Sequence, residues 1–367
     1  MKIAVLTSSR ADYGIYLPLL KAFKNDSFFD LSIIAFGTHL SKNHGYTLNQ
    51  ILEDGFEVLV KVDTMIDGDS PLDISKAIGK TITKFSTIWN ENKFDLVFCL
   101  GDRYEMFAAC VASVPYNIKL AHIHGGEQTL GAIDEVFRHS ITNMSTYHFT
   151  TTDQYKNRII ELKGGDKNIY NVGALSIDNL KTLPLLSVEE FKNKFNIDLS
   201  KPSILVTFHP ETVLLEKNET YINELLAALN ETKNYQFIIT MPNADTMGNM
   251  IREKLNIFIS ENFNAIRVES FGTLGYLSCM KHCSFMLGNT SSGFVESSFF
   301  PKYVINIGER QTGRIVTENI YNCPIEKNAI LKGIEKFNQK KLPASIGIYG
   351  DGNAAKKIVT IIKQFND

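Results

Sequence analysis

The 367-residue chain has no excess of charge of either sign and no long apolar stretch. Its 38 Lys and Arg residues nearly balance its 40 Asp and Glu residues, and no run of like charge occurs, so the broad basic face that nucleic-acid binding needs is missing. The chain enters KIAVLTS without a charged leader, and no apolar run approaches the roughly 18 residues of a membrane span. We therefore expect a globular protein with neither a nucleic-acid nor a membrane partner.

Cysteine is scarce, and the number of cysteines is odd. Cys99 and Cys110 lie in apolar stretches, while Cys279 and Cys283 have no second Cys pair and no His-x-x-x-His that would complete a zinc site. We predict that these cysteines are reduced core residues, that the protein is cytoplasmic and that it has no metal site.

Three kinds of cofactor site have no support in the sequence. Gly79-Lys80-Thr81 resembles the end of a P-loop, but the glycine that is needed five residues earlier is Ile74. The first apolar run is followed by SSRADYG rather than by G-x-G-x-x-G, and we expect no carboxylate pair that is poised to hold Mg²⁺. The sequence thus argues against an NTPase and a nicotinamide-dependent enzyme, and we expect no cofactor.

Short, continuous apolar runs alternate with amphipathic segments along the first half of the chain. Continuous runs are typical of parallel strands that are buried on both faces, and the segments between them are long enough for crossover helices. The expected strands are 3–7, 31–36, 57–62, 96–100, 119–123 and 146–150, and the expected helices include 13–24, 43–53, 74–90, 103–113 and 135–145. This pattern predicts a doubly wound α/β domain.

The same pattern restarts after residue 186. Here the expected strands are 204–208, 237–241, 265–268, 285–287 and 303–307, so we predict a second α/β domain. In the last segment, 351–365, one helical stripe is formed by Ala355, Ile358, Val359, Ile362 and Phe365. We therefore predict a terminal helix that docks on another element.

Polar and small residues follow most of the predicted strands. In parallel sheets the loops at the carboxyl ends of the strands converge, and helix N-termini there present free N–H groups. The loops concerned are 8–13 (SSRADY), 37–39 (GTH), 101–103 (GDR), 122–127 (HIHGGE), 209–212 (HPET), 243–245 (NAD), 288–293 (GNTSSG) and 308–311 (GERQ). If the two edges face each other, one cleft between the domains collects them all.

The loop 288–293 is the strongest candidate for phosphate binding. Small hydroxyl residues at a helix start let backbone amides approach a diphosphate, and Glu296 can accept hydrogen bonds from both hydroxyls of a ribose. The alternative is an ordinary capped helix with an acidic first turn, since Ser, Thr and Gly are common cap residues.

Asp102, His122 and His124 are candidates for proton transfer or for structural roles. Asp102 is next to Arg103, which we expect to lower the pKa of its carboxyl group; the alternative is a buried structural ion pair. His122 and His124 alternate along a strand end, so we expect one in the core and the other in the cleft.

An acidic cluster and a third histidine complete the candidates. Glu127, Asp134, Glu135 and Arg138 follow the two histidines closely, although Asp134 and Glu135 also suit a structural role in the first turn of a helix. His209 ends a strong apolar run and precedes Pro210; the alternative for it is a histidine that is only hydrogen-bonded structure.

Seven motifs follow one another at the ends of successive predicted strands, in the order SSRADYG, GDRYEMF, HIHGGEQTLGAIDEVFRHSIT, VTFHPET, NADT, GNTSSGFVE and NIGERQTGR. Together they resemble the hydrolysing UDP-N-acetylglucosamine 2-epimerases of bacterial sialic acid synthesis, over residues 3 to about 362. Relatives that act on UDP-N,N'-diacetylbacillosamine, in legionaminic acid synthesis, share most of these motifs.

The resemblance implies the two-domain glycosyltransferase-B architecture, with two Rossmann-like domains facing across a cleft and the final helix crossing back. It implies an N-terminal domain of residues 1–175 plus 350–367 on the sugar and catalytic side, and a C-terminal domain of residues 176–349 on the UDP side. We expect hinge closure near residues 172–187. By motif match, UDP would be surrounded by Arg10, Arg103, His209, Asn243, Phe271, Tyr276, Thr290, Ser291, Glu296 and Arg310.

The resemblance also implies elimination of UDP across C1–C2 to a 2-acetamidoglucal, followed by hydration with inversion at C2. Two proton-transfer groups on opposite sides of the ring are needed, and the candidates are Asp102, Glu127, Asp134, His124 and His209. The family has a glutamate where this sequence has His124, so we expect Glu127 or His124 itself to take that role.

Two other classes of function stay open. A glycosyltransferase of the same architecture would need an acceptor, and a nucleotide-sugar sensor would keep residues 288–296 without needing Asp102, Glu127 and Asp134 together. We expect a UDP-sugar substrate, UDP as a product and a homodimer.

Overall fold

The computed structural model describes residues 1–300, 302–338, 340–341 and 343–366, which form two compact units. The first unit consists of Met1–Glu127, Ile133–Thr182 and Ile348–Asp367, and the second of Gln128–Ala132 and Leu183–Gly347. Four positions of the predicted domains lie outside the described residues, namely Pro301, Gln339, Leu342 and Asp367. In the part of the chain that is described, no helix is both long and apolar enough to cross a membrane.

A parallel sheet forms the centre of the first unit. Over the described residues it has seven strands in the order β3-β2-β1-β4-β5-β6-β7. Their bounds are β1 (Lys2–Thr7), β2 (Asp30–Phe36), β3 (Val58–Val62), β4 (Leu96–Leu100), β5 (Leu120–Ile123), β6 (Tyr147–Thr150) and β7 (Ile169–Asn171). Along β1, Ile3 and Val5 join one apolar cluster and Ala4 and Leu6 the other, so both faces of the sheet are covered.

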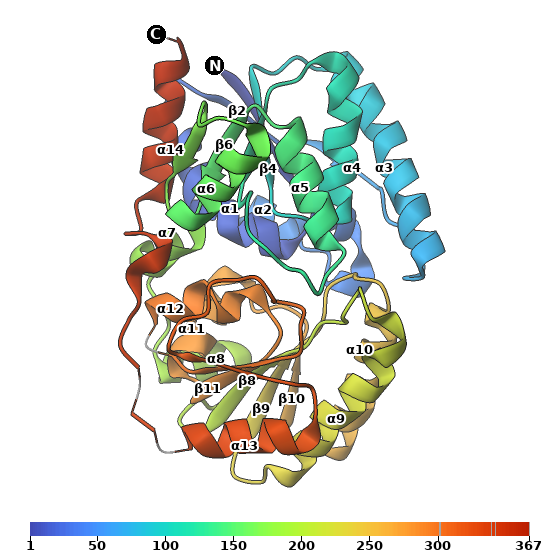
Figure 1. Cartoon of the computed structure of the whole chain (residues 1–367), viewed down its shortest axis with the longest axis vertical. Coiled ribbons are helices and arrows are strands. Elements are labelled where there is room, and N and C mark those ends of the chain that lie inside the picture. Colours follow the sequence, from blue (N-terminus) through green and yellow to red (C-terminus); the bar gives the residue numbers. More distant parts are fainter. Residues whose placement is uncertain (301, 339, 342, 367) are drawn as a thin grey trace. The chain divides into compact units, whose positions relative to one another are not determined.

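Helices cover the two faces of this sheet (Figure 1). One apolar cluster draws on α1 (Arg10–Lys24), α2 (Leu48–Glu53), α7 (Leu175–Thr182) and α14 (Ala354–Lys363). The other draws on α3 (Pro71–Glu91), α4 (Tyr104–Ser113) and α5 (Asp134–Met144), while α6 (Asp153–Lys163) follows β6. The predicted doubly wound α/β fold is confirmed for this unit.

The terminal helix α14 docks on the first unit, as predicted, where it contacts α1 and α7 (Figure 1). The carboxylate of Asp178 in α7 accepts hydrogen bonds from the backbone N–H groups of Ala354 and Ala355, at 2.9 and 2.8 Å. These N–H groups are unpaired at any helix start, so Asp178 caps α14 from another helix. Phe365, just beyond the helix, stacks on Tyr147 with 4.1 Å between the ring centroids.

The second unit repeats the arrangement. Over the described residues its parallel sheet has six strands in the order β10-β9-β8-β11-β12-β13. Their bounds are β8 (Ser203–Thr207), β9 (Gln236–Thr240), β10 (Ala265–Val268), β11 (Phe285–Gly288), β12 (Val304–Ile307) and β13 (Ile320–Cys323). The helices are α8 (Val188–Phe195), α9 (Asn218–Glu231), α10 (Gly248–Glu261), α11 (Gly272–His282), α12 (Glu296–Phe299) and α13 (Lys327–Phe337).

The predicted helix 43–53 is too long at its N-terminal end. Residues Lys42–His44 form a 3₁₀ turn, and α2 begins only at Leu48. The reason is local, because Gly45 and Tyr46 both have positive φ angles, 87° and 44°, which a right-handed helix does not accommodate.

The five cysteines are free and buried, which confirms the prediction of Cys99, Cys110, Cys279 and Cys283 as core residues. Burial raises the pKa of the Cys279 and Cys283 thiols above the ordinary value. Gly79-Lys80-Thr81 lies in the middle of α3 rather than between a strand and a helix, in agreement with the rejection of a P-loop.

Two buried histidines in neighbouring strands make the first unit sensitive to acid. Burial lowers the pKa of His122 to about 3 and that of His148 to about 4, whereas an unfolded histidine has a pKa near 6.5. Below pH 6.5 the unfolded chain therefore binds protons that the folded chain does not. The folded state loses stability as the pH is lowered. We expect each histidine to lower the free energy of unfolding by about 2 kcal/mol between pH 7.5 and pH 5.

Urea unfolding at the two pH values measures this loss. Trp89 is the only tryptophan of the chain and is buried in α3, so its fluorescence reports on the first unit. His148→Gln should remove about half of the loss between pH 7.5 and pH 5, whatever it does to stability at pH 7.5. An unfolding midpoint that is the same at both pH values would contradict the prediction.

Candidate active site

The strand order of the first unit reverses between β1 and β4, which is where ligands bind in open α/β sheets. The loop after β1 carries Ser8 and Ser9 and leads to Arg10 at the start of α1, and the loop after β4 carries Asp102 and Arg103. Both loops leave the carboxyl ends of adjacent strands, so these polar residues lie at one edge of the sheet.

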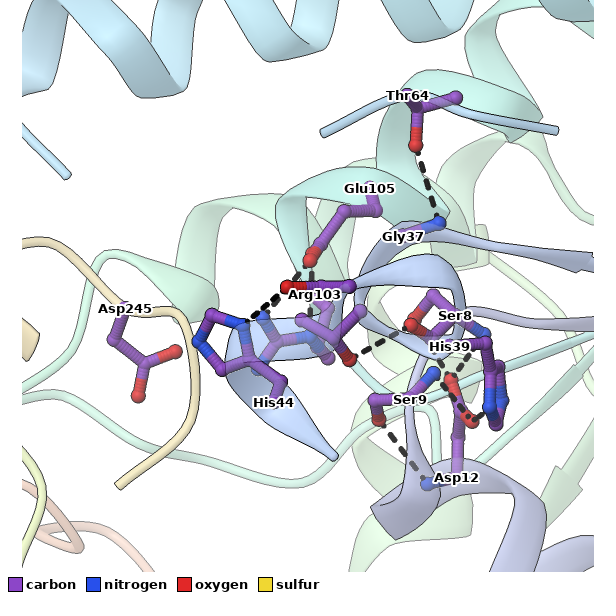
Figure 2. A network of polar contacts seen from close by, with 12 residues as sticks. Ser8, Ser9, Asp12, Gly37, His39, His44, Thr64, Arg103, Glu105 and Asp245 are labelled. Atoms are coloured by element: carbon purple, nitrogen blue, oxygen red, sulfur yellow. Dashed lines mark hydrogen bonds and ion pairs between the residues drawn. The ribbon is translucent and has the colours of Figure 1, made fainter. Parts of the chain in front are cut away.

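A buried carboxylate, Asp12, holds the loop after β1 in place (Figure 2). It accepts hydrogen bonds from the hydroxyl of Thr7 at 2.7 Å, from both the N–H and the hydroxyl of Ser8 at 2.8 and 2.7 Å, and from the N–H of Ser9 at 3.0 Å. Burial opposes ionisation of Asp12, but its interactions with His39, Thr7 and Ser8 outweigh burial and keep its pKa below the ordinary value.

The arginine that contacts Asp102 is Arg138, and this corrects the expectation that Arg103 does so. Arg138 lies in α5, is 1% exposed, and also binds a carboxylate oxygen of Glu135 at 3.3 Å and the carbonyl oxygen of Glu127 at 3.0 Å. Arg103 forms a two-point ion pair with Glu105 instead, with contacts of 2.9 and 3.1 Å (Figure 2). The i,i+2 spacing of Arg103 and Glu105 across the start of α4 brings these two side chains together.

His122 has a structural role. It is fully buried in β5, its Nε2 bonds the carbonyl oxygen of Gly101 at 2.8 Å, and its Nδ1 bonds the hydroxyl of Thr142 at 3.0 Å. Because a carbonyl only accepts, Nε2 carries the proton and Nδ1 accepts from Thr142. His122 therefore fixes the turn that presents Asp102.

His124 and Glu127, which the sequence leaves as alternatives, form a pair. His124 Nδ1 is 2.8 Å from Glu127 Oε1, and the hydroxyl of Thr151 donates to the same oxygen at 3.1 Å. The two residues belong to the turn that follows β5, and both are buried.

Asp134 and Glu135 begin α5, as expected for acidic residues in a first turn. Glu135 has three basic residues around it: besides Arg138, its carboxylate lies 2.8 Å from His139 Nε2 and 3.4 Å from Arg158 Nη2. This ion-pair cluster ties α5 to α6, whereas Asp134 is the first residue of the helix.

In the second unit the strand order reverses between β8 and β11. The two loops that leave these strands are joined: His209 N–H donates to the Asn289 side-chain oxygen, and the Asn289 side-chain N–H donates back to the His209 carbonyl, both at 2.8 Å. At Gly288, whose φ is 146°, an added Cβ would lie 1.8 Å from the carbonyl oxygen of Thr207, so only glycine allows this approach. His209 and loop 288–293 therefore lie next to each other at the ends of β8 and β11.

Asp245 is a buried carboxylate that was not among the predicted site residues. It lies near His209 and Arg310, two residues that are predicted to contact UDP. Its Oδ2 is 3.6 Å from His209 Nδ1 and 3.4 Å from Arg310 Nη2. The loop of Arg310 is held by Glu211, whose carboxylate accepts from the Glu309 N–H at 2.8 Å. Burial raises the pKa of Glu211 above the ordinary value, despite these hydrogen bonds.

The helix after loop 288–293 is shorter than the phosphate argument requires. Thr290 precedes a 3₁₀ turn, Ser291–Gly293, and α12, which begins at Glu296, is only 4 residues long. Its dipole is correspondingly small, so the predicted contribution of a helix N-terminus to diphosphate binding is corrected. The hydroxyl of Tyr276 bonds that of Ser292, which ties this loop to α11.

The remaining predicted nucleotide contacts have different surroundings. Phe271 is 8% exposed and packs against Phe191 and Phe195, at 5.3 and 4.9 Å between ring centroids, so most of its surface is already buried by the protein. Asn243 is half-buried in the loop after β9. In the described part of the chain, no group of three or more His, Cys, Asp and Glu residues is placed to hold a metal ion.

Comparison with known proteins identifies the family of this chain. The family model described as "UDP-N-acetylglucosamine 2-epimerase" matches residues 21–363. The chain belongs to this family. It is 36% identical to the polysialic acid biosynthesis protein P7 of Escherichia coli, over 99% of this chain and 94% of that protein. It is 35% identical to the GDP/UDP-N,N'-diacetylbacillosamine 2-epimerase (hydrolyzing) of Campylobacter jejuni, over 93% of this chain and 88% of that protein.

Solved structures share the fold of this UDP-N-acetylglucosamine 2-epimerase family member. The crystal structure of UDP-GlcNAc 2-epimerase from Neisseria meningitidis bound to UDP-GlcNAc matches with a TM-score of 0.81 at 18% identity, over 99% of this chain and 100% of that chain. The architecture implied by the resemblance, two parallel α/β sheets with the last helix returning to the first unit, is confirmed.

Several residues of this family member that shape the site escaped the sequence analysis. Asp12, His39, Glu105, Glu211 and Asp245 are all acidic or imidazole side chains within or next to the loops after predicted strands. Their position was visible in the sequence, but their role was not, because each acts through a partner far along the chain or in a neighbouring turn.

Proposed function

We propose that this chain is a hydrolysing UDP-sugar 2-epimerase that converts UDP-N-acetylglucosamine and water to N-acetylmannosamine and UDP, in sialic acid synthesis. One observation supports this most directly: Arg138 connects Asp102 to Glu127, the partner of His124, at one sheet edge of the first unit. Several groups able to accept or donate a proton thus lie on adjacent strand ends, as a reaction that removes and replaces one hydrogen requires.

The chemistry follows from the substrate. The C2 hydrogen of UDP-N-acetylglucosamine is not beside a carbonyl group, so its removal must be assisted by the departure of UDP. One group takes the C2 proton while the C1–O bond to the diphosphate breaks, which gives a 2-acetamidoglucal. A water then adds its oxygen at C1, and a second group delivers a proton to the other face of C2. The proposed set for these transfers is Asp102, Glu127, Asp134, His124 and His209.

The diphosphate gains negative charge as it leaves, and fixed cations stabilise such charge without reorganisation. We propose Arg10, Arg103 and Arg310 for this role, with His209, Asn243, Phe271, Tyr276, Thr290, Ser291 and Glu296 as the other UDP contacts. In the second unit, Asp245 lies near both Arg310 and His209, which favours one orientation of these two side chains.

The relatives support a second candidate substrate, because they are named for different sugars at similar sequence identity. The Campylobacter protein that is named for UDP-N,N'-diacetylbacillosamine is 35% identical, against 36% for the polysialic acid protein. The alternative proposal is therefore a hydrolysing UDP-N,N'-diacetylbacillosamine 2-epimerase of legionaminic acid synthesis, which uses the same chemistry at C1 and C2.

Each UDP-sugar should be given to the purified protein separately, in heavy water and without an acceptor. We expect UDP release and a free sugar with inverted configuration at C2 that carries deuterium there; the faster substrate names the pathway. UDP release that needs an acceptor would identify a glycosyltransferase, and binding without turnover would identify a sensor. A released sugar without deuterium at C2 would exclude the proposed elimination.

A further inference from the structure

We propose that His124 and Glu127 act as a dyad: Nε2 of His124 takes the C2 proton of the sugar, and Glu127 is the positioning residue that orients the imidazole. This inference rests on the proposed function and assigns separate roles to two members of its proton-transfer set. It also resolves the alternative left by the sequence, because the two residues share one task.

The contacts of the pair determine which nitrogen carries the proton. An ionised carboxylate only accepts hydrogen bonds, so Nδ1 of His124 donates to Glu127 Oε1 over 2.8 Å. Thr151 donates its hydroxyl to the same oxygen at 3.1 Å and so fixes the carboxylate. In the neutral ring, Nε2 then carries the lone pair, and this tautomer of histidine can act as a base at Nε2.

Nε2 of His124 is buried and has no hydrogen-bond partner among the described residues. The side chain is 9% exposed, and Glu127 is 3% exposed. A buried polar atom without a partner is unfavourable, and a ligand that supplies the partner removes this cost. His122, two residues earlier, differs because both of its ring nitrogens are hydrogen-bonded within the protein.

The backbone of the turn holds the pair in place. His124 has a φ of 65°, an uncommon conformation for a residue other than glycine, and its N–H donates to the carbonyl of Phe149 at 3.2 Å. At Gly126, with a φ of 79°, an added Cβ would lie 2.5 Å from the carbonyl oxygen of Tyr155. The chain therefore turns back so that residue 127 reaches residue 124, and strained backbone of this kind is common at functional sites.

The dyad lies next to Asp102, so two proton-transfer groups are near each other. The strands β4 and β5 are neighbours, and the N–H of Gly101 donates to the carbonyl of Ile123 at 3.0 Å. Arg138 contacts the Asp102 carboxylate and donates to the Glu127 carbonyl at 3.0 Å. One buried guanidinium thus sets the positions of both groups.

The proposed step balances as follows. The C2–H bond breaks and its proton moves to Nε2, the electron pair of that bond forms the C1=C2 bond, and the C1–O bond breaks so that UDP leaves with the C1–O electron pair. Glu127 stabilises the imidazolium that results. Water then gives its hydroxyl to C1 and a proton to the second group, which has delivered its own proton to C2. The proton on His124 is released to solvent.

The first test is chemical rescue of a cavity at position 124. His124→Ala should lower kcat for UDP release by about 10²- to 10⁴-fold and leave the Kd for UDP within about threefold. Added imidazole should raise the kcat of this variant by about tenfold or more, because it supplies the missing base. The matched control is His139→Ala, which removes the other His–Glu pair of this region, also at 2.8 Å; its rate should stay near the wild-type rate and not respond to imidazole.

The second test separates the positioning role of Glu127 from a structural one. Glu127→Gln should lower kcat by about tenfold or more with little change in KM, since the ring stays in place but loses its anionic partner. A carboxylate at position 124 needs no such partner. In the His124→Glu variant, the additional change Glu127→Gln should therefore leave kcat unchanged or raise it. Because Glu127→Gln keeps His124, this test holds even if His124→Ala does not fold.

The outcomes distinguish the two proposals. A wild-type protein that releases no UDP from either sugar overturns the proposed function and the dyad with it. A wild-type protein that turns over, with His124→Ala fully active, or with Glu127→Gln equally costly in both backgrounds, overturns the dyad alone.

Discussion

Replacement of Asp102 by asparagine should lower kcat for UDP release by about 10²- to 10⁴-fold. The amide has the size of the carboxyl group and keeps an oxygen that can accept from Arg138, so the local structure should persist. It cannot take up and return a proton, and it carries no charge. The loss should therefore fall on kcat, while the affinity for UDP stays within a few-fold.

Initial rates of UDP release and calorimetric titration with UDP measure the two quantities. Asp95→Asn is the matched control. Asp95 precedes β4, whereas Asp102 follows it; Asp95 is exposed and accepts a hydrogen bond from the Lys2 N–H at 2.7 Å. Its rate should be within about twofold of the wild-type rate. An Asp102→Asn protein that retains more than about a tenth of the wild-type kcat would refute the assigned role.

Replacement of Arg138 by methionine should destabilise the first unit by about 3–5 kcal/mol. The guanidinium is 1% exposed and binds two carboxylates and a carbonyl oxygen, so its removal leaves buried negative groups without compensation. Arg138→Lys should recover only part of this loss, because an ammonium group cannot reach the same acceptors in a planar fork.

Urea unfolding followed by Trp89 fluorescence measures this destabilisation, since both residues belong to the first unit. Arg158→Met is the control: Arg158 contacts the same Glu135 at 3.4 Å but is 31% exposed, so its loss should cost about 1 kcal/mol or less. Equal unfolding midpoints for Arg138→Met and the wild type would show that Asp102 and Glu135 do not depend on Arg138.

The fold could be predicted where the apolar pattern is strong. The buried strands β1, β4 and β8 are continuous apolar runs, and each was expected within about one residue of its observed bounds. The strands β7 and β13 were missed. They have 3 and 4 residues and include polar side chains, so neither forms a continuous apolar run of strand length.

The positions of the site residues could be predicted from the sequence, but the residues with which they interact could not. The position of Asp102 at the end of β4 follows from the sequence, whereas its ion pair with Arg138 joins residues that are 36 positions apart. His124 and Glu127 are alternatives in the sequence because either could take the role of the family's glutamate. The positive φ angles of His124 and Gly126 bring them together, and such angles are not visible in the pattern of residue types.

The free, buried thiols have a practical consequence for work on this protein. Cys99 and Cys110 belong to the first unit, and Cys279, Cys283 and Cys323 to the second. Alkylating reagents need an exposed thiolate, so they should spare the native chain and mark only what has opened. Because the two units carry different numbers of thiols, the mass added to each molecule records which unit unfolded first.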